Sequence, residues 1–290
     1  MAIMLSRMLS WSRVLFLDDD IAGLEPADMQ RASGLLDIYN VVGLKVAGFP
    51  GHSVVCHAYR QAGGDQQEFI GGGAMVVQLD RSSSFFPEIY NEDWFFLLDA
   101  KGGLQPVTVS GEVIQDPYDP FRPGRARAEE LGDVLAEGIY GLLDQGQSVF
   151  DADEEYWREF LRHRRQFILQ VTEMVRDSGL EAAEKRRRLA VLEKGSLIRL
   201  ADITPALCVA YLQAWASDRE RWQQHLDQLP TGLTRQEAIN ALARPGRPPL
   251  VAYLRQGNTS LAAARSLDSL PQNVRTGLGE RDDQLAGNYR

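Results

Sequence analysis

Three consecutive carboxylates, Asp18, Asp19 and Asp20, are the residues of this sequence with the clearest potential for chemistry. They follow a short apolar run at residues 14–17, which is typical of a buried strand. Adjacent carboxylates repel one another unless solvent or a hard cation neutralises them. A Mg²⁺ or Mn²⁺ ion bound there could hold a diphosphate, because magnesium combines one or two carboxylates with phosphate oxygens of a substrate. The alternative is a strand that runs into an acidic loop, and these residues alone favour neither interpretation.

Three consecutive glycines, Gly71, Gly72 and Gly73, precede another apolar run at residues 74–79. Without a Cβ atom, glycine lets a ligand or another part of the chain approach the backbone closely. A tight turn is the simpler explanation, so the glycines by themselves predict no ligand.

A carboxylate pair, Glu92 and Asp93, stands where a helix over residues 91–98 is expected to begin. Asn91 would cap this helix, and acidic residues are favourable in a first turn. One of the two carboxylates could act as a general base, and the adjacent Trp94 could stack on a ring. Helix capping with aromatic core packing is the alternative, which the segment alone slightly favours.

Taken together, these three segments resemble, in order and approximate spacing, the glycosyltransferases of the GT-A fold, most closely the family 2-like group. The resemblance implies that Asp18 and Asp20 are the DxD aspartates, which bind the metal and the diphosphate of a nucleotide-sugar donor, with Asp19 between them. It also implies that Glu92 and Asp93 form the ED motif, which supplies the base that deprotonates the hydroxyl of an unidentified acceptor. Asp93 is our choice for that base, and inversion at the sugar carbon belongs to the same expectation.

The resemblance covers about residues 1–125 and places the three glycines beside the sugar. Only 17 residues precede Asp18, so we expect a GT-A-like domain that lacks its N-terminal nucleotide-binding portion. Many members place a histidine, the third metal ligand, after the strand that follows the ED helix, and this sequence has none there. Gln115 or Asp116 could donate an oxygen instead. The QxxRW motif of processive synthases is missing, so we do not expect a long-chain polymerase.

Trp94, His57 and Arg60 are further candidates for contact with a substrate. Trp94 could stack on a sugar face, and Arg60 could face a phosphate. His57 could serve a phosphate, a metal or the acceptor. A hydrogen-bonded structural histidine and a core tryptophan are the simpler interpretations of His57 and Trp94.

The composition argues against some classes of function. With 31 Lys and Arg against 40 Asp and Glu, the formal net charge is −9, whereas a nucleic-acid-binding protein needs a basic face. The most apolar N-terminal stretch is interrupted by Arg7 and Arg13, which is unlike a membrane span or a signal peptide. Two cysteines are too few for a disulfide framework, so we expect a cytoplasmic protein. Peripheral membrane contact through residues 158–165 is an alternative to a solvated helix face.

The expected fold class is α/β, with a GT-A-like, Rossmann-like mixed sheet followed by a mostly α-helical C-terminal region. The Pro-Gly pair at 123–124 places a boundary between residues 1–124 and 125–290, whose end at 277–290 should fray. The first part predicts strands at 14–17, 41–46, 74–79 and 106–113, and helices at 26–37 and 91–98. The second part predicts helices over 125–145, 153–177, 180–194, 204–228 and 234–243.

Two alternatives from other classes remain. A phosphatase of the haloacid dehalogenase type also has a strand that ends in Asp-x-Asp, which would make Asp18 the nucleophile and Asp20 the acid/base. Residues 132–137 loosely resemble its distal acidic motif but lie in a helical pattern, and Ala22 stands where Thr or Val is usual. The other alternative is a catalytically degenerate transferase-like protein whose helical region binds a partner.

Overall fold

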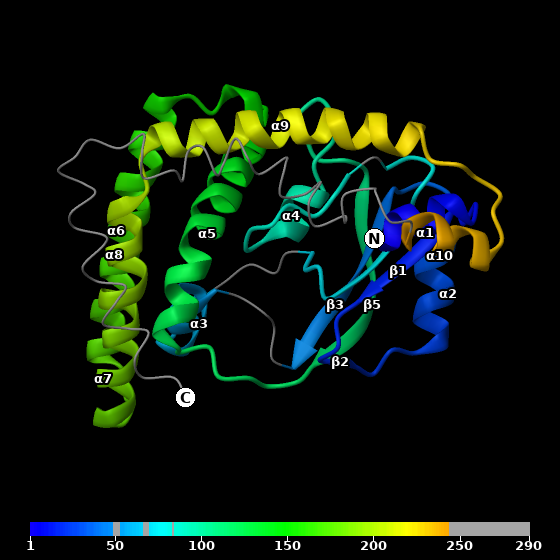
Figure 1. The fold of residues 1–290 in the computed structure, drawn as a ribbon. Helices are drawn as coiled ribbons and strands as arrows, with labels where there is room; N and C mark the ends of the chain where they lie inside the picture. Colours follow the sequence, from blue (N-terminus) through cyan, green and yellow to red (C-terminus); the bar gives the residue numbers. More distant parts are fainter. Residues whose placement is uncertain (49–52, 66–69, 83, 244–290) are drawn as a thin grey trace. The chain divides into compact units, whose positions relative to one another are not determined.

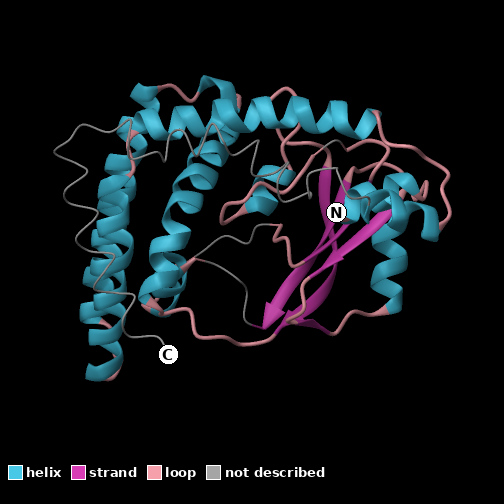
Figure 2. Ribbon diagram, viewed as in Figure 1, coloured by secondary structure: helices cyan, strands magenta, loops and turns pink. Residues whose placement is uncertain are grey.

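A mixed β-sheet dominates the N-terminal half of the described chain, which comprises residues 1–48, 53–65, 70–82 and 84–243 of the computed structural model (Figures 1 and 2). Within those residues the sheet has five strands in the spatial order β1-β4-β3-β5-β2. β3 and β5 run parallel, whereas the other neighbouring pairs are antiparallel. The strands are β1 (Arg13–Leu17), β2 (Ile21–Ala22), β3 (Val41–Gly48), β4 (Ala74–Gln78) and β5 (Val107–Gln115).

The central strands are the most apolar ones. All five residues of β4 are buried, as are the first four residues of β3. Helix α2 (Pro26–Leu35) packs on the sheet, where Ala32 joins a core cluster with Val42 and Val76. Continuous apolar runs of this kind fit strands that are covered on both faces.

The sheet topology carries residues 18–20 across one end of the sheet. β1 and β2 are the two edge strands, and these residues connect them. All four predicted strands are confirmed, whereas the two-residue strand β2 was not predicted. The mixed sheet and the helices that follow it confirm the α/β class.

The helical region begins with α5 (Pro123–Asp144) and α6 (Glu154–Asp177), which pack against each other, and α9 later runs from their side of the molecule toward α1 (Figure 1). A hydrogen bond of 2.9 Å from the Leu233 N–H to the Met8 carbonyl ties the segment before α10 to α1. The five helices predicted for the second part of the chain are confirmed. The remaining helices of the described chain are α1 (Ala2–Met8), α3 (Val54–Gln61), α4 (Glu92–Phe96), a 3₁₀ turn (Val149–Asp151), α7 (Ala182–Val191), a π-helical turn (Leu192–Leu197), α8 (Ile198–Asp202), α9 (Pro205–Asp227) and α10 (Arg235–Ala243).

Helix α4 differs from its prediction in length and in its cap. It ends at Phe96, and the Asn91 side chain makes no capping hydrogen bond to it. Asn91 stands at the N-cap position as predicted, but it does not cap the helix through its side chain. Asn91 instead adopts a left-handed backbone conformation, with φ of 62°, and its side-chain amide donates to Asp133 on α5 at 3.0 Å.

The predicted boundary at residues 123–124 coincides with the start of α5 at Pro123. Residues Met1–Ala243 pack as one compact unit that includes both the sheet and α5 to α10. The predicted division into domains stays a prediction, and the end that we expected to fray lies outside the described residues.

Among the described residues no single helix is long and apolar enough to cross a membrane. One pair of helices, Ala182–Asp202 and Pro205–Asp227, reaches that length and composition only when taken together, and the pair is bent by 75°.

Candidate functional site

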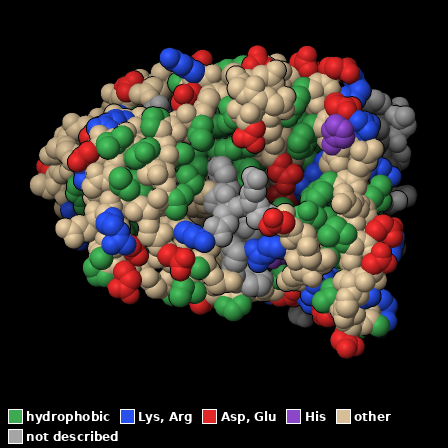
Figure 3. All heavy atoms as spheres, turned by 180° about the vertical axis from the view of Figure 1, so that it is seen from behind, with side chains coloured by type: hydrophobic (Ala, Val, Ile, Leu, Met, Phe, Trp, Pro, Cys, Tyr) green, Lys and Arg blue, Asp and Glu red, His purple; other side chains and the backbone are tan. Residues whose placement is uncertain are grey.

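A cavity of about 450 Å³ lies between the sheet, α4 and α5, and this volume is within the range of small-molecule sites. The face opposite to that of Figure 1 is hollowed near its middle, with hydrophobic and acidic side chains around the hollow (Figure 3). The carboxylates that line the cavity are Asp18, Glu92, Asp93, Asp133 and Glu137. The first three belong to what we call the sheet-side wall, together with the three glycines. Asp133 and Glu137 belong to α5, which forms the helical wall.

The sheet-side wall joins the three segments that sequence analysis singled out. The Asp18 N–H donates to the Gly73 carbonyl at 2.9 Å. The Gly72 N–H donates to the Asp93 carboxylate at 2.6 Å. These two hydrogen bonds hold together residues 71–73, which we call the glycine loop, residues 18–20, which we call the aspartate turn, and α4. Segments more than 70 residues apart in sequence therefore share one surface.

Gly72 is the glycine whose missing Cβ matters most. A Cβ atom there would lie 2.7 Å from the Cβ of Asp93, which is closer than real contacts allow. At Gly73 the nearest atom would be Ile21 Cδ1 at 3.3 Å, and at Gly71 a Cβ would meet no described atom within 4 Å. The loop can therefore approach Asp93 only because residue 72 has no side chain.

The electrostatic surroundings of Asp93 favour a proton acceptor near neutral pH. Burial, and secondly the charge of Glu92, raise the pKa of Asp93 from 3.8 to about 6, against the opposing hydrogen bond from Gly72. Burial and the charge of Asp18 also raise the pKa of Glu92. A general base works best when its pKa lies close to the working pH, so Asp93 has the properties of a base.

The three aspartates occupy different positions. Asp18 lines the cavity, whereas Asp19 and Asp20 do not. Partial burial, followed by the charges of Asp20 and Asp19, raises the pKa of Asp18. Asp20 accepts a hydrogen bond of 2.9 Å from the side-chain amide of Gln115, which itself lines the cavity.

The described residues contain no group of three or more His, Cys, Asp and Glu side chains that could hold a metal ion. Asp18 and Asp20 with Gln115 nevertheless offer the oxygen ligands that Mg²⁺ and Mn²⁺ prefer, and such ions often complete their shell with water and substrate phosphate. The chemistry of the donor set fits the predicted ion, and the metal site stays a prediction.

The three candidate substrate residues are separated in the structure. Trp94 lines the cavity and packs edge-on against Tyr140 of α5, at 4.8 Å between ring centroids. His57 and Arg60 lie on α3 and do not line the cavity. His57 is buried with its Nε2 3.0 Å from the Tyr118 hydroxyl, which agrees with the structural interpretation of this histidine.

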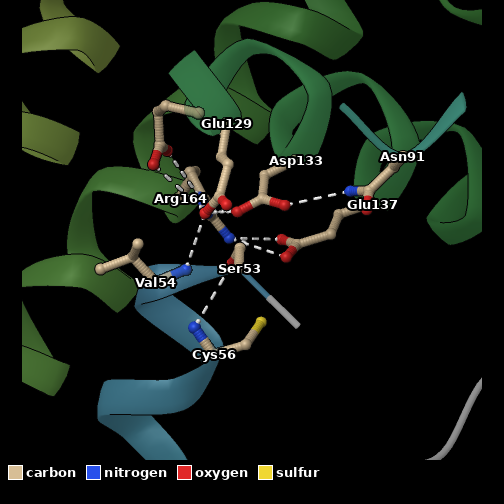
Figure 4. A network of polar contacts seen from close by, with 9 residues as sticks. Ser53, Val54, Cys56, Asn91, Glu129, Asp133, Glu137 and Arg164 are labelled. Atoms are coloured by element: carbon tan, nitrogen blue, oxygen red, sulfur yellow. Dashed lines mark hydrogen bonds and ion pairs between the residues drawn. The ribbon is translucent and has the colours of Figure 1, made fainter. Parts of the chain in front are cut away.

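The helical wall contains the residues that sequence analysis missed (Figure 4). The buried guanidinium of Arg164 on α6 binds three carboxylates of α5: Glu130 at 2.9 Å, Asp133 at 2.8 Å and Glu137 at 2.7 Å. Next to them, Glu129 pairs with Arg125 and accepts the N–H of Val54 at 3.0 Å. The side chains of Arg164 and Glu130 are each 1% exposed, so this is a buried network of charges.

Burial in this network changes carboxylate ionisation. It raises the pKa of Glu129 and of Glu130 to about 7 each, although Arg125 and Arg164 respectively oppose the shift. One sequence signal could have revealed the network. Glu129, Asp133 and Glu137 are four residues apart, and like charges at that spacing destabilise a helix unless a cation compensates them.

Comparison with protein families, curated proteins and solved structures found no match for the chain.

Proposed function

We propose that the protein is a metal-dependent glycosyltransferase with a GT-A-like catalytic sheet, which moves a sugar from a nucleotide-sugar donor to an acceptor hydroxyl. One observation carries the proposal. Asp18, the three glycines and the Glu92-Asp93 pair line one cavity, as expected for a donor site beside a catalytic base.

Asp93 would act as the base. Its carboxylate takes the proton of the acceptor hydroxyl, whose oxygen forms a bond to the anomeric carbon. The bond between that carbon and the diphosphate oxygen breaks with its electrons remaining on the diphosphate, so the sugar configuration inverts. With a pKa of about 6, Asp93 is mostly ionised at pH 7 and can accept the proton.

Asp18 and Asp20 would hold Mg²⁺ or Mn²⁺, which supplies positive charge against the leaving diphosphate when bound. The glycine loop leaves room for the sugar beside Asp93, because Gly71 lines the cavity and a Cβ atom there would meet no described atom within 4 Å. Trp94 offers a ring face or edge in the same cavity.

The proposal is tested by titrating UDP-sugars and GDP-sugars calorimetrically into the protein with and without Mn²⁺. We expect binding that requires Mn²⁺ and that Asp20→Ala abolishes. Asp37→Ala is the matched control, because Asp37 is exposed and pairs with Arg13 away from the cavity. Absence of binding for all donors would contradict the proposal and favour the degenerate, partner-binding alternative.

The phosphatase alternative is tested separately with p-nitrophenyl phosphate and Mg²⁺. It requires Asp18 to be phosphorylated and residues 132–137 to serve as the distal acidic motif. In the structure Asp133, within that motif, is 3% exposed and bound to Arg164. That ion pair favours the transferase proposal over the phosphatase, and hydrolysis lost in Asp18→Asn would reverse the preference.

A further inference from the structure

The turn that leads into α4 has an unusual backbone. Asn91, directly before Glu92 and Asp93, has φ of 62° and ψ of 36°. Among the described residues other than glycine, only Asn91 and Ser10 have a positive φ. Asparagine tolerates this conformation better than most residues, but the surroundings must still hold it.

A chain of polar contacts connects this turn to the buried charges of the helical wall (Figure 4). The Asn91 side-chain amide donates to Asp133 Oδ1 at 3.0 Å. The other oxygen of Asp133 accepts from Arg164 Nη2 at 2.8 Å. Asp133 is 3% exposed and the Arg164 side chain is 1% exposed. Burial and their opposite charges therefore fix the two residues to which Asn91 is connected.

Two further contacts bring α5 against the same turn. A Cβ atom at Gly132 would lie 2.1 Å from the Tyr90 carbonyl oxygen, so the backbones of α5 and of the turn touch directly. On the other side of Asp93, the Trp94 carbonyl accepts from the Tyr140 hydroxyl at 3.0 Å. Helix α5 therefore holds the segment on both sides of the carboxylate.

We propose that Asn91, Asp133 and Arg164 are positioning residues that fix the turn before α4 and thereby aim the Asp93 carboxylate at the acceptor. This inference rests on the proposed function, because it takes Asp93 as the base. It assigns the helical region a part in catalysis, because α5 and α6 hold the base in place through the turn before α4. Displacement of a catalytic group by about 1 Å can cost up to about 100-fold in rate.

The test compares two substitutions of one residue. Asn91→Gly removes the side-chain bond and tolerates the positive φ, whereas Asn91→Ala removes the bond and disfavours that φ as well. The first readout is nucleotide release from a panel of UDP-sugars and GDP-sugars with Mn²⁺. The second is hydrogen–deuterium exchange of the α4 backbone, which needs no activity. Asn40→Ala is the control, since Asn40 bonds Gln105 outside the cavity.

For Asn91→Gly we expect kcat to fall about tenfold with KM for the donor unchanged, and exchange in α4 to accelerate. In Asn91→Ala we expect kcat to fall further than in Asn91→Gly. Asp133→Asn keeps an oxygen that can accept from Asn91, so its kcat should stay higher than that of Asp133→Ala.

The positioning role would be overturned if Asn91→Gly had faster exchange in α4 but an unchanged kcat. It would also be overturned if both the exchange rate and kcat of Asn91→Gly equalled those of the wild-type protein.

Failure of the proposed function has a different result. If the wild-type protein bound none of the donors with Mn²⁺ and released no nucleotide by transfer of the sugar to water, the transferase proposal would fail. Exchange in α4 would then decide whether the contact chain holds the turn, because unchanged exchange in Asn91→Gly would overturn that step independently.

Discussion

The sheet-side wall and the helical wall of the cavity both present carboxylates, but the partners of those carboxylates differ. On the sheet-side wall, Asp93 accepts a backbone N–H of the glycine loop, and the described contacts include no ion pair of Asp18, Glu92 or Asp93 with Lys or Arg. On the helical wall, Asp133 shares the guanidinium of Arg164 with two other carboxylates. The structure thus holds Asp133 in a fixed ion pair, whereas the proposed function assigns the carboxylates of the sheet-side wall to a proton, a metal ion and a substrate.

The largest effect on stability should come from the centre of the helical wall. Arg164→Met leaves the buried carboxylates of Glu130 and Asp133, and the partly exposed one of Glu137, without their cation. We therefore expect the free energy of unfolding to fall by about 3–5 kcal/mol. Arg158→Met is the control, because Arg158 is exposed and its pairing with Glu155 contributes about 0–1 kcal/mol. Chemical denaturation measures both. Equal losses in the two variants would show that the buried network is not the anchor of this wall.

The sheet-side wall should be sensitive to volume rather than to charge. Gly72→Ala places a Cβ against Asp93, so we expect a loss of about 1–3 kcal/mol in unfolding free energy. Gly71→Ala has space for its methyl group among the described atoms and should change stability by less than about 0.5 kcal/mol. Thermal or chemical denaturation of the pair decides whether the two glycines differ as the structure requires.

The pH dependence of transfer sharpens the assignment of Asp93. A base must be ionised, and the pKa of Asp93 is raised to about 6. We therefore expect kcat/KM to be constant above that pH and to fall about tenfold per pH unit well below it. The measurement is nucleotide release across pH 4.5–8 under conditions where the fold is intact. A profile that is flat down to pH 4.5 would assign the base to another group.

The smallest effect concerns Glu129 in the helical wall. Its pKa is raised from 4.5 to about 7, so between these values the folded protein holds a proton that the unfolded chain has released. Stability should therefore decrease as the pH rises through this window. Glu129→Gln cannot ionise and should therefore lose less stability than the wild-type protein over the window. Glu154→Gln, on the exposed start of α6, is the control, and identical slopes in all three proteins would contradict the prediction.

The sequence predicted the elements well where the pattern of apolar residues was local. The strands β1, β3, β4 and β5 and the long helices α5, α6 and α9 follow from apolar runs and helical periodicity. The short strand β2 has two residues and depends on pairing with the end of β5, which no local pattern shows. Helix α3 was also missed. Its apolar and polar residues lie on opposite faces, but its eight residues are fewer than the window over which helical periodicity is read.

In the candidate site, too, some residues could be predicted from local sequence and others could not. Asp18, the glycines and Asp93 could be selected because consecutive carboxylates and glycines are conspicuous in a sequence. The role of Asn91 could not be predicted, since its partner Asp133 is 42 residues away and the contact arises from packing of α5. Arg164 was hidden for the same reason, because its three carboxylates belong to another helix.

The most direct test of the account is nucleotide release by Asp93→Asn compared with the wild-type protein, with donor affinity measured in parallel. Asparagine keeps the shape of the side chain and cannot take the acceptor proton. We predict that Asp93→Asn binds the nucleotide-sugar with wild-type affinity and transfers at a rate lower by about 10²–10⁴-fold. Full transfer activity in Asp93→Asn would contradict the assignment of Asp93 as the base.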